Sequence, residues 1–158
     1  MSKHTPHQHQ GRLAMVVFHV GPYRAALEAR HVLAMTDAPS MSRKANAHTL
    51  LHANDTTERQ FPPNRWLTLR LPPQAGLPHS HVPPARINRS DPGHLWQLGV
   101  NDDITLQQLS TDALYPLPAL LRPRCFTDAL RGVTFIQQQL VLLLDATRLM
   151  PQDLRHQP

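Results

Sequence analysis

The segment from Leu130 to Leu149 constrains the fold more than any other part of the chain. Residues 133–136 are β-branched or aromatic, which is typical of a strand, and three glutamines separate them from an unbroken apolar run, Leu140–Leu144. Such a run predicts a strand that is buried on both faces, so two strands meet across a short polar turn. Asp145 ends the second strand. Its carboxylate can accept a backbone N–H, which predicts a short helical turn before Pro151.

The pattern of this segment resembles the carboxyl-terminal half of CheW-like chemotaxis coupling proteins. Those proteins likewise run through a proline-containing segment, a Gly-Val strand and a hydrophobic strand that ends in Leu-Leu-Asp. The residues that carry the pattern are Gly132, Leu144, Asp145, Pro116 and Pro118. Residues 15–28 are similar to the opening hairpin of that family. Nothing in residues 36–64 matches the family's Gly-x-x-x-x-Arg-Gly segment, so we expect the first half of the domain to be reduced.

The resemblance implies an all-β fold of two small SH3-like half-barrels that share a core, with short helical turns. It also implies a non-catalytic adaptor of a bacterial chemosensory system, because relatives bridge the cytoplasmic tip of a chemoreceptor to the regulatory domain of the histidine kinase CheA. The expected partners are a CheA-type kinase, a chemoreceptor tip or both, with other CheW-like domains as further candidates. A member without the Arg-Gly segment fits equally well as a protein that binds one partner or competes with a complete coupling protein.

Alternation of apolar and polar residues places the remaining elements. Leu13–Val20 and Tyr23–Leu27 are predicted to form a hairpin around the Gly21-Pro22 turn. Residues 28–35 have helical propensity, but the resemblance implies that they continue as a strand. Asn46 is predicted to cap a short helix over 47–53. Further strands are expected at 65–71, 94–100 and 104–109, with a turn at 101–103. The predicted core consists of Val16, Phe18, Val20, Leu27, Leu67, Leu69, Leu98, Val100, Leu106, Val133, Phe135, Val141 and Leu143.

Composition divides the chain into one domain and three polar segments. Residues 1–11 form a His-rich tail with nothing to bury, and residues 151–158 a second short tail, and both are expected to be disordered. Residues 12–150 are expected to form a single domain. Within it, residues 72–93 carry six prolines and few apolar side chains, which predicts a long loop.

The formal net charge of +5 is spread over scattered arginines rather than concentrated in a run. A basic β-barrel that binds nucleic acid is the alternative function, and it requires exposed aromatic residues among arginines. The candidates for stacking are Trp66, Tyr23, Tyr115 and Phe61. Scattered charge disfavours this alternative, because nucleic-acid interfaces concentrate their cations.

No enzyme motif is recognisable in the sequence, so we expect no catalytic residues, no cofactor and no metal site. Asp102 and Asp103 are adjacent and would point to opposite sides of a strand, and the lone Cys125 is expected to be a small buried residue. Histidines at 4, 7 and 9, and at 79 and 81, lack the further ligands that zinc needs, and a metal-dependent activity through the histidines is kept only as a further alternative. A single cysteine and the absence of a run of about 20 apolar residues predict a cytoplasmic protein that does not insert into membranes.

Overall fold

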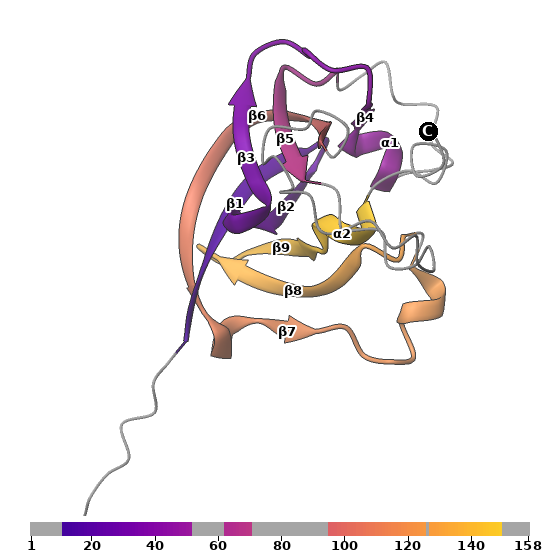
Figure 1. Ribbon diagram of the computed structural model, residues 1–158. Helices are drawn as coiled ribbons and strands as arrows, with labels where there is room; N and C mark the ends of the chain where they lie inside the picture. The colour runs from indigo at the N-terminus through magenta and orange to yellow at the C-terminus, as the bar shows by residue number, and fades with distance from the viewer. Residues whose placement is uncertain (1–10, 52–61, 71–94, 126, 150–158) are drawn as a thin grey trace, which may run out of the picture.

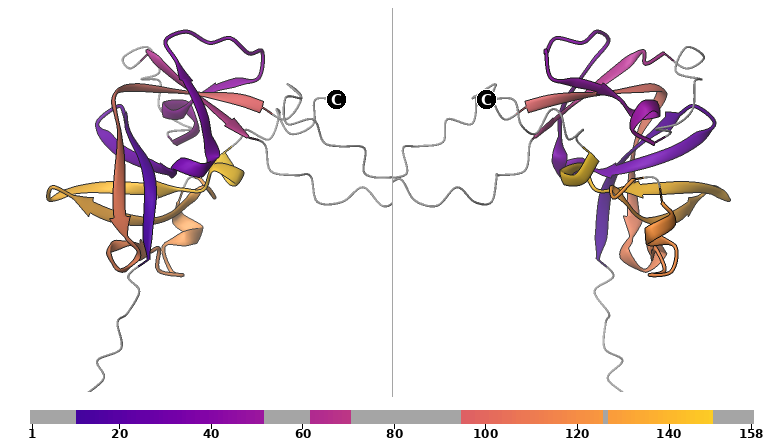
Figure 2. Two further views of the ribbon diagram at one scale, coloured as in Figure 1. Left: turned by 60° about the vertical axis from the view of Figure 1, so that its left-hand side comes forward. Right: turned by 90° about the vertical axis from the view of Figure 1, so that its right-hand side faces the viewer.

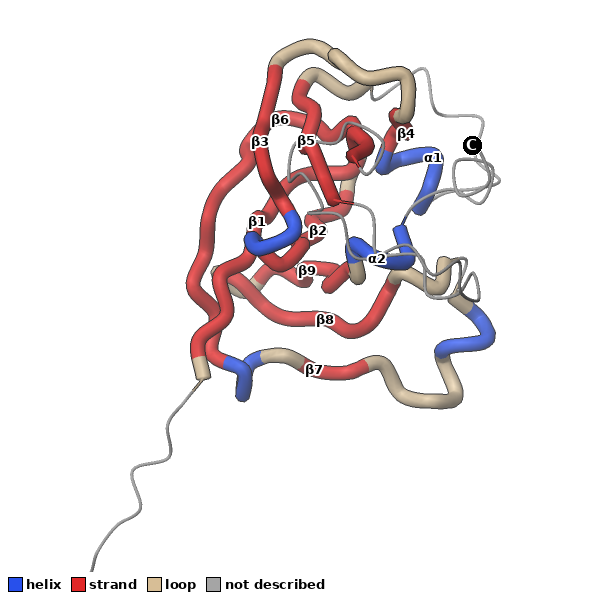
Figure 3. Tube along the Cα trace, viewed as in Figure 1, coloured by secondary structure: helices blue, strands red, loops and turns tan. Residues whose placement is uncertain are grey.

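The computed structural model describes residues 11–51, 62–70, 95–125 and 127–149. Strands dominate it (Figure 3), and the all-β prediction is confirmed. The strands are β1 (Arg12–Val20), β2 (Tyr23–Glu28), β3 (Val32–Thr36), β4 (Lys44–Asn46), β5 (Arg65–Arg70), β6 (Leu95–Ser110), β7 (Tyr115–Pro116), β8 (Leu130–Ile136) and β9 (Gln139–Leu144). The helices are α1 (Ala47–Leu51) and α2 (Ala146–Leu149), with 3-10 turns at Ala29–His31, Thr111–Ala113 and Arg122–Arg124.

The strands form one mixed sheet in the order β3-β5-β6-β1-β2-β9-β8-β7, with β4 pairing to β6 off this path. The pairs β2–β9 and β4–β6 are parallel, and the other pairs are antiparallel. The long strand β6 joins two groups: its first part pairs with β4 and β5, and its last part pairs with β1. Figure 1 shows β6 curving from the group around β3 and β5 down toward β7.

The predicted break in β6 at residues 101–103 is wrong, because the strand continues through these residues. Asp103 has a φ of 66°, in the left-handed region that aspartate tolerates better than most residues. The register with β1 shifts at the same place, between Val17 and His19. Between the pairs Val17–Thr105 and His19–Asn101, β6 has two residues more than β1, so β6 bends at a bulge there instead of ending.

Two short elements refine the predictions for residues 28–53. The strand expected over residues 28–35 is interrupted by the 3-10 turn Ala29–His31, after which β3 pairs with β5. Asn46 caps α1 as predicted, since its Oδ1 accepts a hydrogen bond from the backbone N–H of His48 at 3.0 Å. The hairpin of β1 and β2 is also confirmed.

Two clusters of buried side chains pack on the sheet. The larger lies between the two groups of strands and includes Phe18, Leu27, Leu51, Trp96 and Leu98. The smaller packs on the other face of β8 and β9 and includes Met15, Val17, Ile136, Val141 and Leu143. The buried positions that were predicted correctly are Val16, Phe18, Val20, Leu27, Leu67, Leu69, Leu98, Val100, Val141 and Leu143.

Three predicted core positions differ from the structure: Val133 is half-buried, while Leu106 and Phe135 are 66% and 58% exposed. Beyond its bulge β6 pairs with β1 on one side and has no described strand on the other, so Leu106 is covered from one flank only. Phe135 lies near the tip of the β8–β9 hairpin, which projects beyond the neighbouring strands (Figure 2). Leu140 lies opposite Phe135 and is 49% exposed, so β9 is not buried on both faces at its start.

Several predictions fall on residues outside those that the structure describes. They are the two terminal tails, the proline-rich loop at 72–93, the histidines at 4, 7, 9, 79 and 81, and Phe61. The division into a single domain at 12–150 with a reduced first half stays a prediction.

Candidate functional site

The residues singled out by the sequence pattern lie around the terminal hairpin of β8 and β9. Gly132 pairs with Pro116 of β7 on one side and with Leu143 of β9 on the other. A Cβ added to Gly132 would lie 2.4 Å from the backbone oxygen of Tyr115. Glycine is therefore required for β7 to approach β8 this closely. Two residues beyond Pro116, the exposed Pro118 accepts a backbone hydrogen bond from Leu121 at 2.9 Å.

Asp145 organises the end of β9. Its Oδ1 accepts hydrogen bonds from the backbone N–H and the hydroxyl of Thr147, at 2.9 and 2.6 Å, and so caps α2. Its backbone N–H donates to Ala129 at 2.8 Å. Its second oxygen lies 3.7 Å from Nε of Arg148 and 4.0 Å from Nε of Arg131. These contacts fix the carboxylate beside Leu144, which is buried in the larger core cluster.

Leu144 and Asp145 also line a groove that the sequence did not predict. The groove has a volume of about 430 Å³ and lies between β1, the 3-10 turn after β2, the end of β9 and the start of α2. The side chains that line it are Leu13, Met15, Glu28, Arg30, His31, Leu114, Arg131, Leu143, Leu144, Asp145, Ala146 and Thr147. We call this the interstrand groove.

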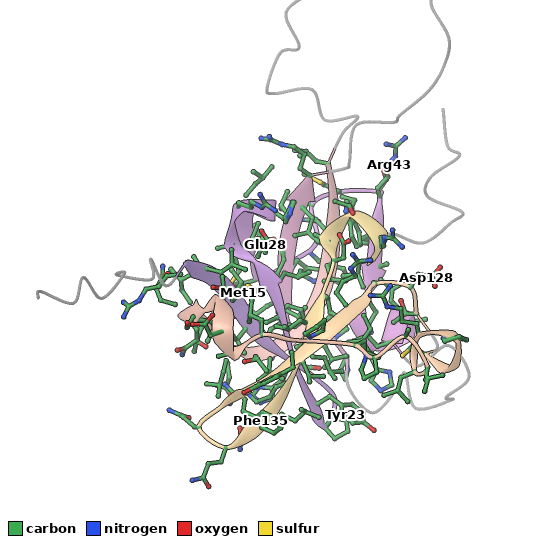
Figure 4. The ribbon with its side chains drawn as sticks, turned by 90° about the horizontal axis from the view of Figure 1, so that it is seen from below. Met15, Tyr23, Glu28, Arg43, Asp128 and Phe135 are labelled. Carbon is green, nitrogen blue, oxygen red and sulfur yellow. The ribbon has the colours of Figure 1, made fainter. Side chains whose placement is uncertain are left out.

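The interstrand groove combines an apolar floor with charged edges. Met15 and Leu143 belong to the smaller core cluster, and Leu13 and Leu114 pack against that cluster. Arg30 and Glu28 form an ion pair at 2.5 Å along one edge. Figure 4 shows Met15 and Glu28 close together on the same part of the molecule. An apolar floor between charged edges is the arrangement that accepts an amphipathic segment of another protein.

A second surface lies at the tip of the terminal hairpin. Four large side chains, Tyr23, Tyr115, Phe135 and Leu140, are exposed there by 47%, 52%, 58% and 49%. We call them the hairpin patch. In Figure 4, Tyr23 and Phe135 lie on the side of the molecule away from Met15 and Glu28. The sequence pattern predicted Phe135 in the core. Tyr23 and Tyr115 were predicted only as candidates for stacking on nucleic-acid bases.

Nowhere in the described ranges do three or more His, Cys, Asp or Glu side chains lie close enough together to hold a metal ion. Asp103 lies 3.8 Å from His19, and Asp103 is mostly exposed. Cys125 is half-buried and its thiol contacts the backbone oxygen of Leu121 at 3.3 Å. Neither helix in the described part of the chain is long and apolar enough to span a membrane.

The nucleic-acid alternative is not favoured by these surfaces. Trp66 is half-buried and contacts the ammonium of Lys44 at 6.0 Å from its ring centroid. Tyr115 is exposed but its ring packs edge-on against Phe135, at 6.4 Å between centroids. Aromatic residues in this state form an apolar surface rather than a series of free stacking platforms among cations.

Comparison with known proteins adds one finding about the fold. No family model matches the sequence. No curated protein matches it either. Among solved structures, the chain is similar to the scaffolding protein TtCheW from Thermoanaerobacter tengcongensis, with a TM-score of 0.59 and 12% sequence identity. The match covers 93% of this chain and 93% of that protein, so the two share a fold along nearly their whole length.

Proposed function

We propose that this protein is a non-catalytic adaptor of a bacterial chemosensory system, which binds the regulatory domain of a CheA-type histidine kinase, the cytoplasmic tip of a chemoreceptor, or both. The observation that carries the proposal is the similarity of fold to a scaffolding protein of the CheW type over 93% of both chains. The motif residues Gly132, Leu144 and Asp145, which first indicated the resemblance, are consistent with it. Gly132 and Leu144 pair within the β8–β9 hairpin, and Asp145 follows β9 directly.

The interstrand groove is the surface that suits this function. Its apolar floor gives a partner segment buried contact area, while the edges, where Arg30 lies beside Glu28 and Arg131 beside Asp145, offer polar groups of both signs to the segment. A groove of this kind binds through surface complementarity and needs no reactive group. Such contacts are reversible, which suits a protein that links other components of a signalling assembly.

The test is isothermal titration calorimetry of the full chain against a CheA regulatory domain and against a receptor tip fragment from the same organism. Saturable binding to at least one of them is expected. Leu114→Asp places a charge on the apolar floor of the interstrand groove and is expected to weaken that binding by about tenfold or more.

Leu106→Asp is the matched control, because it makes the same change at an exposed leucine that does not line the interstrand groove. This variant is expected to bind as the unaltered protein does. Binding to the kinase alone would restrict the function to one partner. Failure to bind either partner contradicts the adaptor proposal, and an equal loss in both variants contradicts the assignment of the groove.

A further inference from the structure

The hairpin patch is continuous across four strands on one face of the sheet. Phe135 and Leu140 lie directly opposite each other in the β8–β9 register, and Tyr115 pairs with Val133 on the face that Phe135 shares. The rings of Tyr115 and Phe135 meet at an interplanar angle of 69°, an edge-to-face packing that holds both in place. Large exposed apolar side chains that are gathered and ordered in this way mark an interaction surface.

A depression of about 350 Å³ adjoins the hairpin patch where the pairing of β2 with β9 begins. It is lined by His19, Pro22, Tyr23, Arg24, Gln139, Leu140 and Leu142. Residues 139 and 140 pair with β8, but the register of β9 with β2 starts only at residue 141. The start of β9 is therefore open on this side, next to two exposed side chains of the patch.

Arg24 gives the depression a chemical preference. Its Nη1 donates a hydrogen bond to Oε1 of Gln139 at 2.7 Å, which holds the guanidinium in the depression. Its Nε is buried and has no hydrogen-bond partner among the described residues. A buried N–H of a permanent cation costs stability when it is left without an acceptor. No carboxylate belongs to the described residues that line the depression.

We infer that the hairpin patch and this depression form a second docking surface, which takes an extended segment of an acidic partner protein. A large apolar side chain of the segment lies on Phe135 and Leu140, and a neighbouring carboxylate pairs with the guanidinium of Arg24. The inference is independent of the partners proposed for the interstrand groove. In Figure 4, Tyr23 and Phe135 of the patch lie apart from Met15 and Glu28 of the groove.

Charge selects this occupant over two others. A nucleic acid presents a phosphate at every nucleotide and needs several cations along its path, whereas Arg24 is the one arginine or lysine among the described residues that line the depression. A second copy of the chain carries the same formal charge of +5, and a two-fold contact through the patch would bring Arg24 toward its own counterpart. A carboxylate-bearing segment meets neither obstacle.

The experiment titrates the full chain with short blocked peptides and follows backbone amide shifts by NMR. The peptides share their leucines and a phenylalanine, and differ only in carrying aspartates, asparagines or lysines. The aspartate peptide is expected to bind most tightly and to shift residues 23–24, 135 and 139–142. Arg24→Gln is expected to reduce its affinity by about tenfold, the loss of one charge-assisted hydrogen bond. Phe135→Ser, which keeps Arg24 in place, is expected to weaken all three peptides.

Leu106→Ser and the groove variant Leu114→Asp are the controls, and both are expected to bind the aspartate peptide as the unaltered protein does. The inference is overturned if the lysine peptide binds as tightly as the aspartate peptide, or if the shifts fall outside the patch and depression. It is also overturned if a single-stranded oligonucleotide competes for the patch, or if Phe135→Ser abolishes a self-association of the chain. A failure here leaves the calorimetry of the interstrand groove unaffected, so the two proposals can fail separately.

Discussion

Gln97 ties a long loop to the sheet, and replacing it should destabilise the protein. Its side chain is fully buried on β6. Oε1 accepts hydrogen bonds from the backbone N–H groups of Ser40 and Met41, at 2.8 and 3.1 Å. Nε2 donates to Oγ of Ser40 at 3.2 Å, with longer contacts to the hydroxyls of Thr36 and Thr68 at 3.5 and 3.4 Å. The amide thus holds the connection between β3 and β4.

The substitution Gln97→Met keeps the length of the side chain and removes all of these hydrogen bonds. Three of them have good distances, and each contributes on the order of 1 kcal/mol. Part of the loss is offset, because methionine is apolar and because the exposed loop around Ser40 can hydrate its freed N–H groups. The free energy of unfolding is therefore expected to fall by about 2 kcal/mol.

Urea denaturation followed by circular dichroism measures this change in the unfolding midpoint. Hydrogen exchange adds a local reading, since the amide protons of Ser40 and Met41 should exchange roughly tenfold faster or more in the variant. Gln108→Met is the matched control, because Gln108 lies on the same strand with its side chain exposed. The control should change stability by less than about 0.5 kcal/mol. If Gln97→Met is as stable as the control and both amides stay protected, the reasoning is refuted.

Two other substitutions test the terminal hairpin. Gly132→Ala should lower the free energy of unfolding by about 1–3 kcal/mol, because its Cβ would meet the backbone oxygen of Tyr115 at 2.4 Å and force β7 away. The control is Gly11→Ala, whose Cβ would meet a movable Thr111 side chain at 3.3 Å. It should lower the free energy of unfolding clearly less in the same urea titration. Asp145→Ala should lower the free energy of unfolding by about 1 kcal/mol, because the cap of α2 is lost. Asp145→Asn should retain most of the stability, since asparagine can also cap a helix. Equal losses of stability for the two variants in thermal unfolding would contradict the capping role.

The local signals in the sequence predicted the hairpins and caps well. The Gly21-Pro22 turn, the Asn46 cap and the polar turn at Gln137 and Gln138 are all determined by residues close to one another in the chain. In that last turn both glutamines have positive φ, at 51° and 63°, which suits a tight two-residue hairpin. Features of this kind depend on local backbone geometry, so a single sequence contains the information that specifies them.

Contacts between distant segments could not be predicted in the same way. Gln97 alternates with apolar residues on β6 as a solvent-facing side chain would, yet the loop that covers it comes from residues 36–41, almost sixty positions away. The bulge at Asp103 looked like a turn, because aspartate favours both. The interstrand groove likewise gathers residues from both ends of the chain. Each of these features depends on segments that are distant in the chain, and a single sequence does not show which segments meet.

The exposed hairpin patch follows from the same limit, and it shows where function can be missed. Periodicity places Phe135 in the core with Val133, and the unbroken apolar run assigns Leu140 and Leu142 to a strand that is buried on both faces. What decides their burial is the length of the neighbouring strands: β2 begins to pair with β9 only at residue 141, and β7 contributes two residues. Apolar side chains that lie beyond the ends of these neighbouring strands face solvent, although their sequence pattern is that of a buried strand. Gathered apolar side chains that remain exposed favour association with a partner that covers them. We therefore expect such a fold to bind other proteins where an apolar strand extends beyond the strand that pairs with it.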